Sequence, residues 1–314
     1  MTIYTRETPT NMLRWHTAAA VVHLVSACLI TFTMRPSIEY CKRSLNFTGY
    51  EYVKSTSPFT RNIPIEVFPN VNPIMWVAWN EWITFASHLL GVWQHTYQNE
   101  TPRRGYSRKI EYTRRWIEYA VTAGLLEVAF LVGQGETNLH VVQLVLVGNA
   151  ALQLVGWSQD VNRGWDPTLT LAAGFLLLTG VLFVMAEHAV NQTGIQMEWG
   201  MLVVLFGIFY ASFGVHQTLY VVSKQYAETY DVDKVYIILS ITSKTVLSWT
   251  FVAIYRKTWA RLGQPIQDYA VGFEDDPDNW NIVMWTLSGV GFLLLVATYV
   301  VPLAGYPQGY EPCR

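Results

Sequence analysis

The chain has 314 residues, of which 51% are hydrophobic and only 14% are charged, whereas soluble domains carry about 25% charged residues. This composition indicates a protein that crosses a membrane several times, and the net charge of −2 argues against a nucleic-acid partner. Its three cysteines form neither a disulfide framework nor a zinc-binding spacing, and no P-loop, dinucleotide-binding or hydrolase motif is present. We therefore expect no enzyme and no metal site.

Hydrophobic segments long enough to cross a bilayer recur along the whole sequence, since a spanning helix needs about 20 mainly apolar residues. In chain order these segments are 13–34, 73–96, 109–133, 139–158, 167–189, 198–222 and 235–256, followed by 282–303. The first run has no convincing cleavage site, so we interpret it as a retained helix. The sequence thus predicts an all-α, seven-transmembrane-helix bundle over residues 1–262. Residues 263–314 add an acidic linker and a probable eighth apolar helix.

The connection 35–72 is long for a compact bundle. Aromatic residues around Thr48-Gly49 predict a short hairpin, and Ile65–Phe68 predicts a further strand, so we expect a β-rich loop outside the membrane. It would serve either as a folded cap or as a subunit interface, and the sequence leaves both open.

The positive charges predict an orientation with the N-terminus in the cytoplasm. In that orientation 12 Lys and Arg residues lie inside and 8 outside, and the cluster from Arg103 to Arg115 is the strongest contribution. Glycosylation sequons at Asn46 and Asn191 would then lie outside, whereas a third sequon, at Asn99, would lie inside.

Lys244 lies near the middle of the apolar segment 235–256. At about 1.5 Å per residue, it is roughly 13 Å from the start of that helix. A lysine at this depth costs several kcal/mol and indicates a functional site. The chemistry that suits such an amine is condensation with an aldehyde to form a Schiff base.

A buried cation needs an anion beside it, and Glu118 in segment 109–133 is the best candidate because it lies at a similar depth. In the alternative interpretation, Glu118 is an interfacial carboxylate neutralised by Arg115. Ser240 precedes Lys244 by four residues and shares its helix face. It would donate to the counterion region or bond the carbonyl four residues before it.

Other polar residues lie in the apolar segments. His23 and His88 suggest a hydrated cavity toward the inside. Four further acids, which are proton-relay candidates, are Glu127, Glu187, Glu198 and Asp160. Glu127, Glu187 and Glu198 would form an outside-facing proton path, or simply lie near the outer interface.

An aromatic stripe in segment 198–222 consists of Phe206, Phe209 and Phe213, spaced three and then four residues apart. Such a stripe is typical of ordinary packing, and opposite a Schiff-base lysine it also suits a flat polyene.

Several stretches together resemble the heliorhodopsins, a branch of the retinal-binding microbial rhodopsins. These stretches are Leu13-Arg-Trp-His16 with His23, Phe85-Ala-Ser-His88-Leu, Arg115-Trp-Ile-Glu118-Tyr119, Asn149-Ala-Ala-Leu-Gln-Leu-Val-Gly156 and Ser240-Ile-Thr-Ser-Lys244-Thr. The resemblance covers about residues 10–262 and includes the inverted orientation and the long first outside loop. The family usually ends soon after its seventh helix, whereas this chain continues.

The resemblance implies that Lys244 binds all-trans retinal as a protonated Schiff base, with Glu118 as sole carboxylate counterion. It further implies that Ser240 bonds within this cluster and that His23 and His88 line the inside cavity. Tyr119 and Thr122, which lie one and four residues after Glu118, are further candidates for contact with the cofactor. Asp160 matches a position that is often Glu in the family. The family is dimeric and mostly does not pump ions, although some viral members carry proton currents.

Three functions follow as hypotheses. The first is a photoreceptor of heliorhodopsin type, embedded in the lipid bilayer as a homodimer, which signals to an unidentified partner through conformational change. The second is a light-driven or light-gated proton transporter or channel. The third is a light-independent transporter or receptor, which would remain colourless with retinal.

Overall fold

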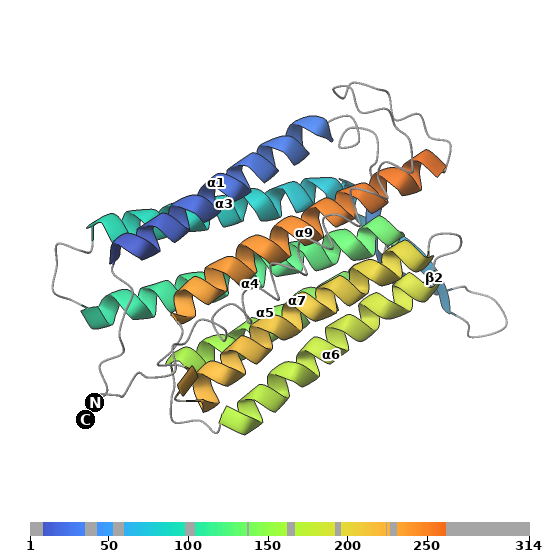
Figure 1. The fold of residues 1–314 in the computed structure, drawn as a ribbon. Coiled ribbons are helices and arrows are strands. Elements are labelled where there is room, and N and C mark those ends of the chain that lie inside the picture. Colours follow the sequence, from blue (N-terminus) through green and yellow to red (C-terminus); the bar gives the residue numbers. More distant parts are fainter. Residues whose placement is uncertain are drawn as a thin grey trace, which may run out of the picture.

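The fold is a bundle of membrane-length helices, seen in a computed structural model (Figure 1). The structure describes residues 9–34, 43–52, 60–97, 104–136, 138–161, 167–191, 196–223, 225–226 and 231–261. Within them the helices are α1 (Pro9–Thr33), α3 (Pro73–Tyr97), α4 (Arg104–Gln134), α5 (Leu139–Val161), α6 (Pro167–Asn191), α7 (Gln196–Val222) and α9 (Val232–Arg261). The predicted segments agree with these helices to within a few residues. The predicted eighth segment, 282–303, and its acidic linker lie outside the described residues.

The helix boundaries follow from local sequence. Proline is the first residue of α1, α3 and α6, where its missing amide hydrogen costs nothing. The side chains of Asn72, Asn138 and Asp231 accept hydrogen bonds, at 2.8, 3.0 and 3.1 Å, from the backbone amides two residues later, and so cap α3, α5 and α9. Gly135 ends α4 with a φ of 105°, which side-chain-bearing residues rarely adopt.

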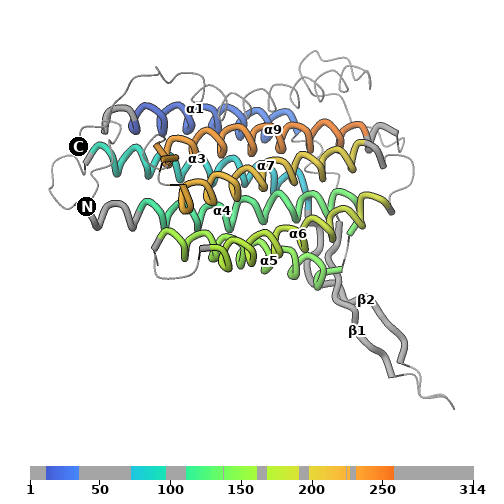
Figure 2. Tube along the Cα trace, turned by 60° about the horizontal axis from the view of Figure 1, so that its bottom comes forward, coloured from blue at the N-terminus to red at the C-terminus, as the bar shows by residue number. Residues whose placement is uncertain are grey.

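The helices form a closed ring in which each packs against its neighbour along the chain. The last described helix, α9, returns to pack against α1 and α7, and it also contacts α3 and α4 (Figures 1 and 2). Because α9 carries Lys244, this arrangement surrounds the lysine with helices from both ends of the sequence.

Six of the described helices are long and apolar enough to cross a membrane, namely α1, α4, α5, α6, α7 and α9. This confirms an integral, multi-pass membrane protein. The exception, α3, has the length, but its interior-facing residues include Asn80, Glu81 and His88, all at most 3% exposed. Its polarity therefore points into the bundle, while Leu90 and Trp93 on the same helix are exposed.

Apolar side chains fill the centre of the bundle and also cover its outer surface. The aromatic rings of Phe130, Trp199, Phe206 and Phe251 pack edge to face in the core. Leu176, at 74% exposed, is typical of the large apolar side chains on the outside of α6. An apolar exterior on long helices suits contact with lipid chains.

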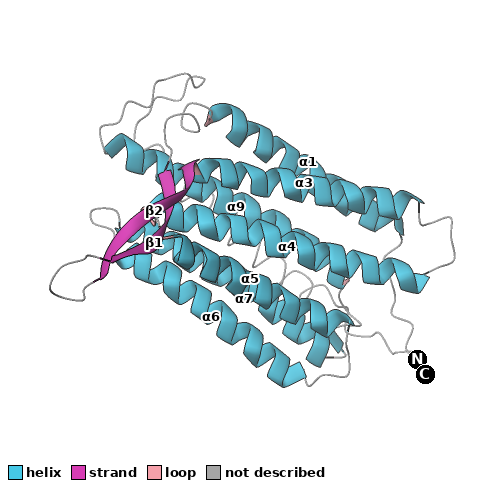
Figure 3. Cartoon of the chain, turned by 180° about the vertical axis from the view of Figure 1, so that it is seen from behind, coloured by secondary structure: helices cyan, strands magenta, loops and turns pink. Residues whose placement is uncertain are grey.

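A two-stranded antiparallel sheet joins α1 to α3 and projects from one end of the bundle (Figure 3). Strand β1 (Arg43–Tyr52) pairs with β2 (Thr60–Val71), with Phe47 opposite Ile65 and an irregular register near Leu45. The short hairpin predicted around Thr48-Gly49 is wrong, because both residues lie within β1 and pair with β2, whereas the strand predicted at Ile65–Phe68 lies within β2.

Candidate functional site

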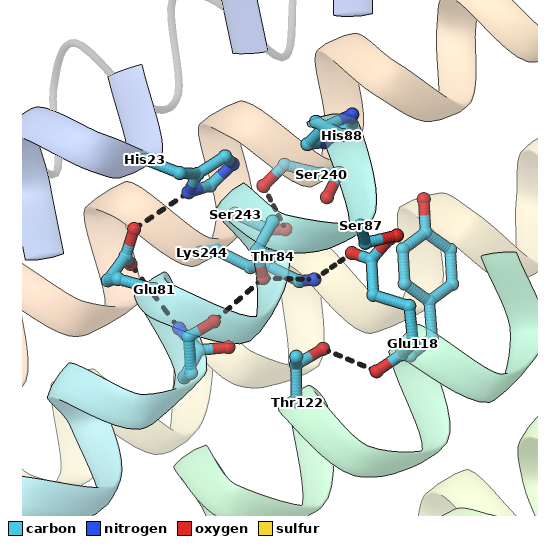
Figure 4. Close-up of polar contacts among 12 residues, drawn as sticks. His23, Glu81, Thr84, Ser87, His88, Glu118, Thr122, Ser240, Ser243 and Lys244 are labelled. Carbon is cyan, nitrogen blue, oxygen red and sulfur yellow. Dashed lines mark hydrogen bonds and ion pairs between the residues drawn. The ribbon is translucent and has the colours of Figure 1, made fainter. Parts of the chain in front are cut away.

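Lys244 and Glu118 form a close ion pair in the middle of the bundle. The Lys244 Nζ lies 2.5 Å from Glu118 Oε1 and donates a second hydrogen bond to Thr84 Oγ1 at 2.8 Å (Figure 4). The exposed fractions of the Lys244 and Glu118 side chains are 6% and 4%, so both charges are withdrawn from water. Such a pair is retained only where each charge is compensated by its surroundings.

A hydrogen bond from α3 and an ion pair within α4 hold the second oxygen of the Glu118 carboxylate. Ser87 donates to Oε2, and Arg114 Nη1 lies 3.7 Å from the same oxygen. Arg114 also donates to the Ser87 carbonyl at 2.8 Å and to its hydroxyl at 2.6 Å. Glu118 is therefore bound by a lysine on one side and by a serine–arginine unit on the other.

Arg115 does not neutralise Glu118, which overturns the alternative interpretation from the sequence. Its guanidinium instead donates to Asp160 Oδ2 at 2.8 Å and to Asp233 Oδ1 at 2.7 Å. Asp160 also accepts hydrogen bonds from Trp116 at 2.6 Å and from Gln217 at 3.1 Å. Asp160 thus belongs to an ion-pair network that joins α4, α5, α7 and α9.

The other predicted neighbours of Lys244 take several positions. The Tyr119 ring centroid is 5.1 Å from Lys244 Nζ, and Thr122 Oγ1 donates to the Glu118 carbonyl at 2.8 Å. Ser240 is buried, and its carbonyl accepts a hydrogen bond from Ser243 Oγ at 3.4 Å. Among the described residues, the hydroxyl groups that hydrogen-bond to Lys244 Nζ and to the Glu118 carboxylate are those of Thr84 and Ser87.

The two predicted histidines lie together, in a larger histidine cluster. The rings of His23 and His88 stack with centroids 5.6 Å apart, and His88 Nδ1 is 3.0 Å from His16 Nδ1. His16, His95 and Glu111 place one donor atom each within 4.8 Å of one another, an arrangement that could hold a metal ion. These three residues come from three helices, so no spacing motif could have indicated them.

A second acid, Glu81, lies in this region and was missed from the sequence. Its Oε2 is 2.7 Å from His23 Nδ1, and its Oε1 accepts hydrogen bonds from Ser248 at 2.6 Å and Asn80 at 3.3 Å. A signal was available, because residues 81, 84 and 88 are polar and repeat at the spacing of one helix face.

An apolar cavity extends from Lys244 between α4, α5, α6, α7 and α9. It encloses about 830 Å³ of empty space, part of it open to the surroundings, and its walls include Trp116, Tyr119, Gly156 and Phe213. A cavity with aromatic walls and a paired amine at its edge fits a flat, apolar aldehyde that reacts with Lys244.

The remaining candidates are distributed over the bundle. Phe213 lines the cavity and packs edge to face on Tyr119 at 5.2 Å, whereas Phe206 and Phe209 belong to the apolar core. Glu127 is completely buried. Glu198 pairs with Lys257 at 2.8 Å, and Glu187 is exposed. The three acids of the expected outside path therefore lie in three different settings.

No curated protein matches the chain. The family model of the heliorhodopsins, which are retinal-binding, light-sensing membrane proteins, matches residues 12–255. The match includes Lys244, Glu118, Thr84 and Ser87, and covers most of the described bundle. The chain belongs to the heliorhodopsin family.

Proposed function

We propose that this protein is a photoreceptor in which Lys244 holds all-trans retinal as a protonated Schiff base and Glu118 is the counterion. The observation that carries the proposal is the distance of 2.5 Å between Lys244 Nζ and Glu118 Oε1, at the edge of an apolar cavity. Bound retinal supplies light absorption and a change of shape on isomerisation.

The chain's own residues would convert that change into a signal. Lys244 on α9 contacts Thr84 on α3 and Glu118 on α4, and Arg114 links Glu118 to the backbone of Ser87. A shift of charge at Lys244 therefore alters contacts between three helices at once. Such a change can bias a bundle between two arrangements, which a partner protein would detect.

The proposal includes a cytoplasmic N-terminus and a homodimer, both of which follow the sequence and the family resemblance. The aromatic side chains of Tyr119 and Phe213 would lie against the polyene, because both line the cavity from which Lys244 is reached.

A spectrum of the purified protein with added all-trans retinal tests the proposal. The unmodified protein should absorb in the visible range, and Lys244→Ala should be colourless. A matched control is Lys257→Ala, which removes another lysine of α9, the one paired with Glu198, and should keep the colour. Borohydride reduction followed by peptide mass analysis should place a retinyl group on Lys244. Visible colour in Lys244→Ala would contradict the linkage.

A further inference from the structure

We propose that Glu81 is a second carboxylate of the Lys244 site, which stabilises the positive charge on the lysine nitrogen from the side opposite Glu118. This inference rests on the proposed function for its spectroscopic test, and it departs from the sole carboxylate counterion that the family resemblance implies. The view in Figure 4 places Glu81 and Glu118 to either side of Lys244.

The Glu81 side chain is buried too deeply to be an incidental surface charge. Glu81, His23, Asn80 and Ser248 are all 0% exposed, and they come from α1, α3 and α9. An acid inside a membrane bundle is costly, so its presence indicates a role. The hydroxyl of Ser248 and the amide of Asn80 both donate to Glu81, which matches the acceptor-only chemistry of an ionised carboxylate.

The register of two helices places this carboxylate beside the lysine. Glu81 and Thr84 are three residues apart on α3, and Lys244 and Ser248 are four apart on α9. Thr84 contacts Lys244, and Glu81 contacts Ser248. The two contacts therefore join the same two helices at neighbouring levels, about one helix turn (roughly 5.4 Å) apart along the helix axes. Opposite charges on neighbouring turns of two packed helices attract each other in a buried site.

The balance of charge explains why a second acid is useful here. Arg114 lies 3.7 Å from Glu118, so the single Glu118 carboxylate faces two cations, Arg114 and Lys244. Counted as formal charges, the two acids Glu81 and Glu118 balance the two bases Arg114 and Lys244. Among the described residues, the titratable and charged groups around Lys244 are His23 on α1, Glu81 and His88 on α3, and Arg114, Glu118 and Tyr119 on α4.

The first test is a pH titration of the visible absorption in chloride-free sulfate buffer, so that no small halide replaces a missing carboxylate. Removing a negative charge makes the cation easier to deprotonate. In Glu81→Gln, the pH at which half of the visible absorption is lost should therefore fall by about 1 to 2 units. The double variant Glu118→Gln with Glu81→Gln should lose its colour at a pH where Glu118→Gln alone keeps it.

The matched control combines Glu118→Gln with Glu127→Gln, which removes a different completely buried acid of α4. It should behave like Glu118→Gln alone. If the double variant Glu118→Gln with Glu81→Gln also loses its colour at the same pH as Glu118→Gln alone, the inference is overturned. Should that variant not fold, Glu81→Asp in the Glu118→Gln background replaces it. Its visible absorption should be lost at a pH close to that of Glu118→Gln alone, because Glu81→Asp keeps the carboxylate. Loss of colour at the lower pH expected of the Glu81→Gln double variant would contradict the inference.

The second test needs no retinal. Glu81→Gln, Lys244→Met and the combined variant form a double-mutant cycle, read as melting temperature of the retinal-free protein. Glu81→Gln should lower the melting temperature more when Lys244 is present than in the Lys244→Met background. Equal effects in both backgrounds would overturn the inference. A wild-type protein that forms no pigment would instead defeat the proposed function and leave this cycle readable.

Discussion

At the residue scale, the site depends on how one carboxylate is held. One Glu118 carboxylate oxygen accepts a hydrogen bond from Lys244 and the other accepts one from Ser87. The Glu118 backbone carbonyl accepts a hydrogen bond from the Thr122 hydroxyl. Arg114 fixes Ser87 through both its hydroxyl and its carbonyl. The carboxylate therefore has one well-defined position, and any chromophore on Lys244 would experience a fixed field.

Replacing Glu118 tests this field directly. Glu118→Gln keeps the side-chain shape but removes the anion that stabilises the ground-state cation, so the visible band should move to longer wavelength. The measurement is the absorption spectrum of the retinal-bound variant at a pH where the pigment is protonated. Glu127→Gln, on the same helix, should leave the band in place. A band that does not move in Glu118→Gln would assign the main counterion role to another group.

At the element scale, the helices themselves were predictable, because length and apolarity define a membrane span whatever its neighbours are. Lys244 and Glu118 were also predictable, since depth along two helices can be compared by counting residues. The partners Thr84, Ser87 and Arg114 were not, because they depend on how each helix is rotated about its axis. Arg114 and Arg115 are adjacent in sequence, yet they point to different helices and serve different acids.

The Arg115 network should be more important for stability than for colour. Arg115→Gln leaves Asp160 and Asp233 without their shared cation, and breaking a buried pair in this way costs about 3–5 kcal/mol. We expect a clear drop in the melting temperature of the purified protein. Arg114→Gln is the matched control, because its guanidinium lies near Glu118. That variant should change the spectrum more and the melting temperature less. A reversed order would contradict the assignment of the two arginines.

A close contact between α4 and α5 shapes the cavity wall. A Cβ atom added at Gly156 would lie 2.3 Å from the Trp116 ring, which must then move. Gly156→Ala should destabilise the protein by about 1–3 kcal/mol, as other overpacking substitutions do, and should alter the absorption band, because both residues line the cavity. Thermal unfolding and a spectrum measure the two effects.

Gly180 provides the control for that substitution. A Cβ atom added there meets no atom within 4 Å, so Gly180→Ala should be neutral or slightly stabilising. Equal losses in both variants would show that helix flexibility, rather than the Trp116 contact, explains the effect of Gly156→Ala.

At the scale of the whole molecule, the positive charges predict which end of the bundle faces the cytoplasm. An epitope tag placed before Met1 should be recognised by antibody only after the cells are permeabilised, because the cluster from Arg103 to Arg115 resists translocation. Neutralising Arg103, Arg104 and Arg108 should weaken that preference. Recognition of the tag on intact cells expressing the unmodified protein would reverse the proposed orientation.

The polar inner face of α3 has a consequence for how the chain is made. This helix enters the bilayer early in synthesis, with Asn80, Glu81 and His88 on one face, but Ser248 and Lys244, which lie opposite that face, are synthesised much later. Until α9 arrives, lipid is a poor solvent for those groups. We therefore expect α3 to insert together with α1, whose His23 contacts Glu81. We expect α3 to reach its final depth in the bilayer only after α9, the last described helix of the ring, has been synthesised.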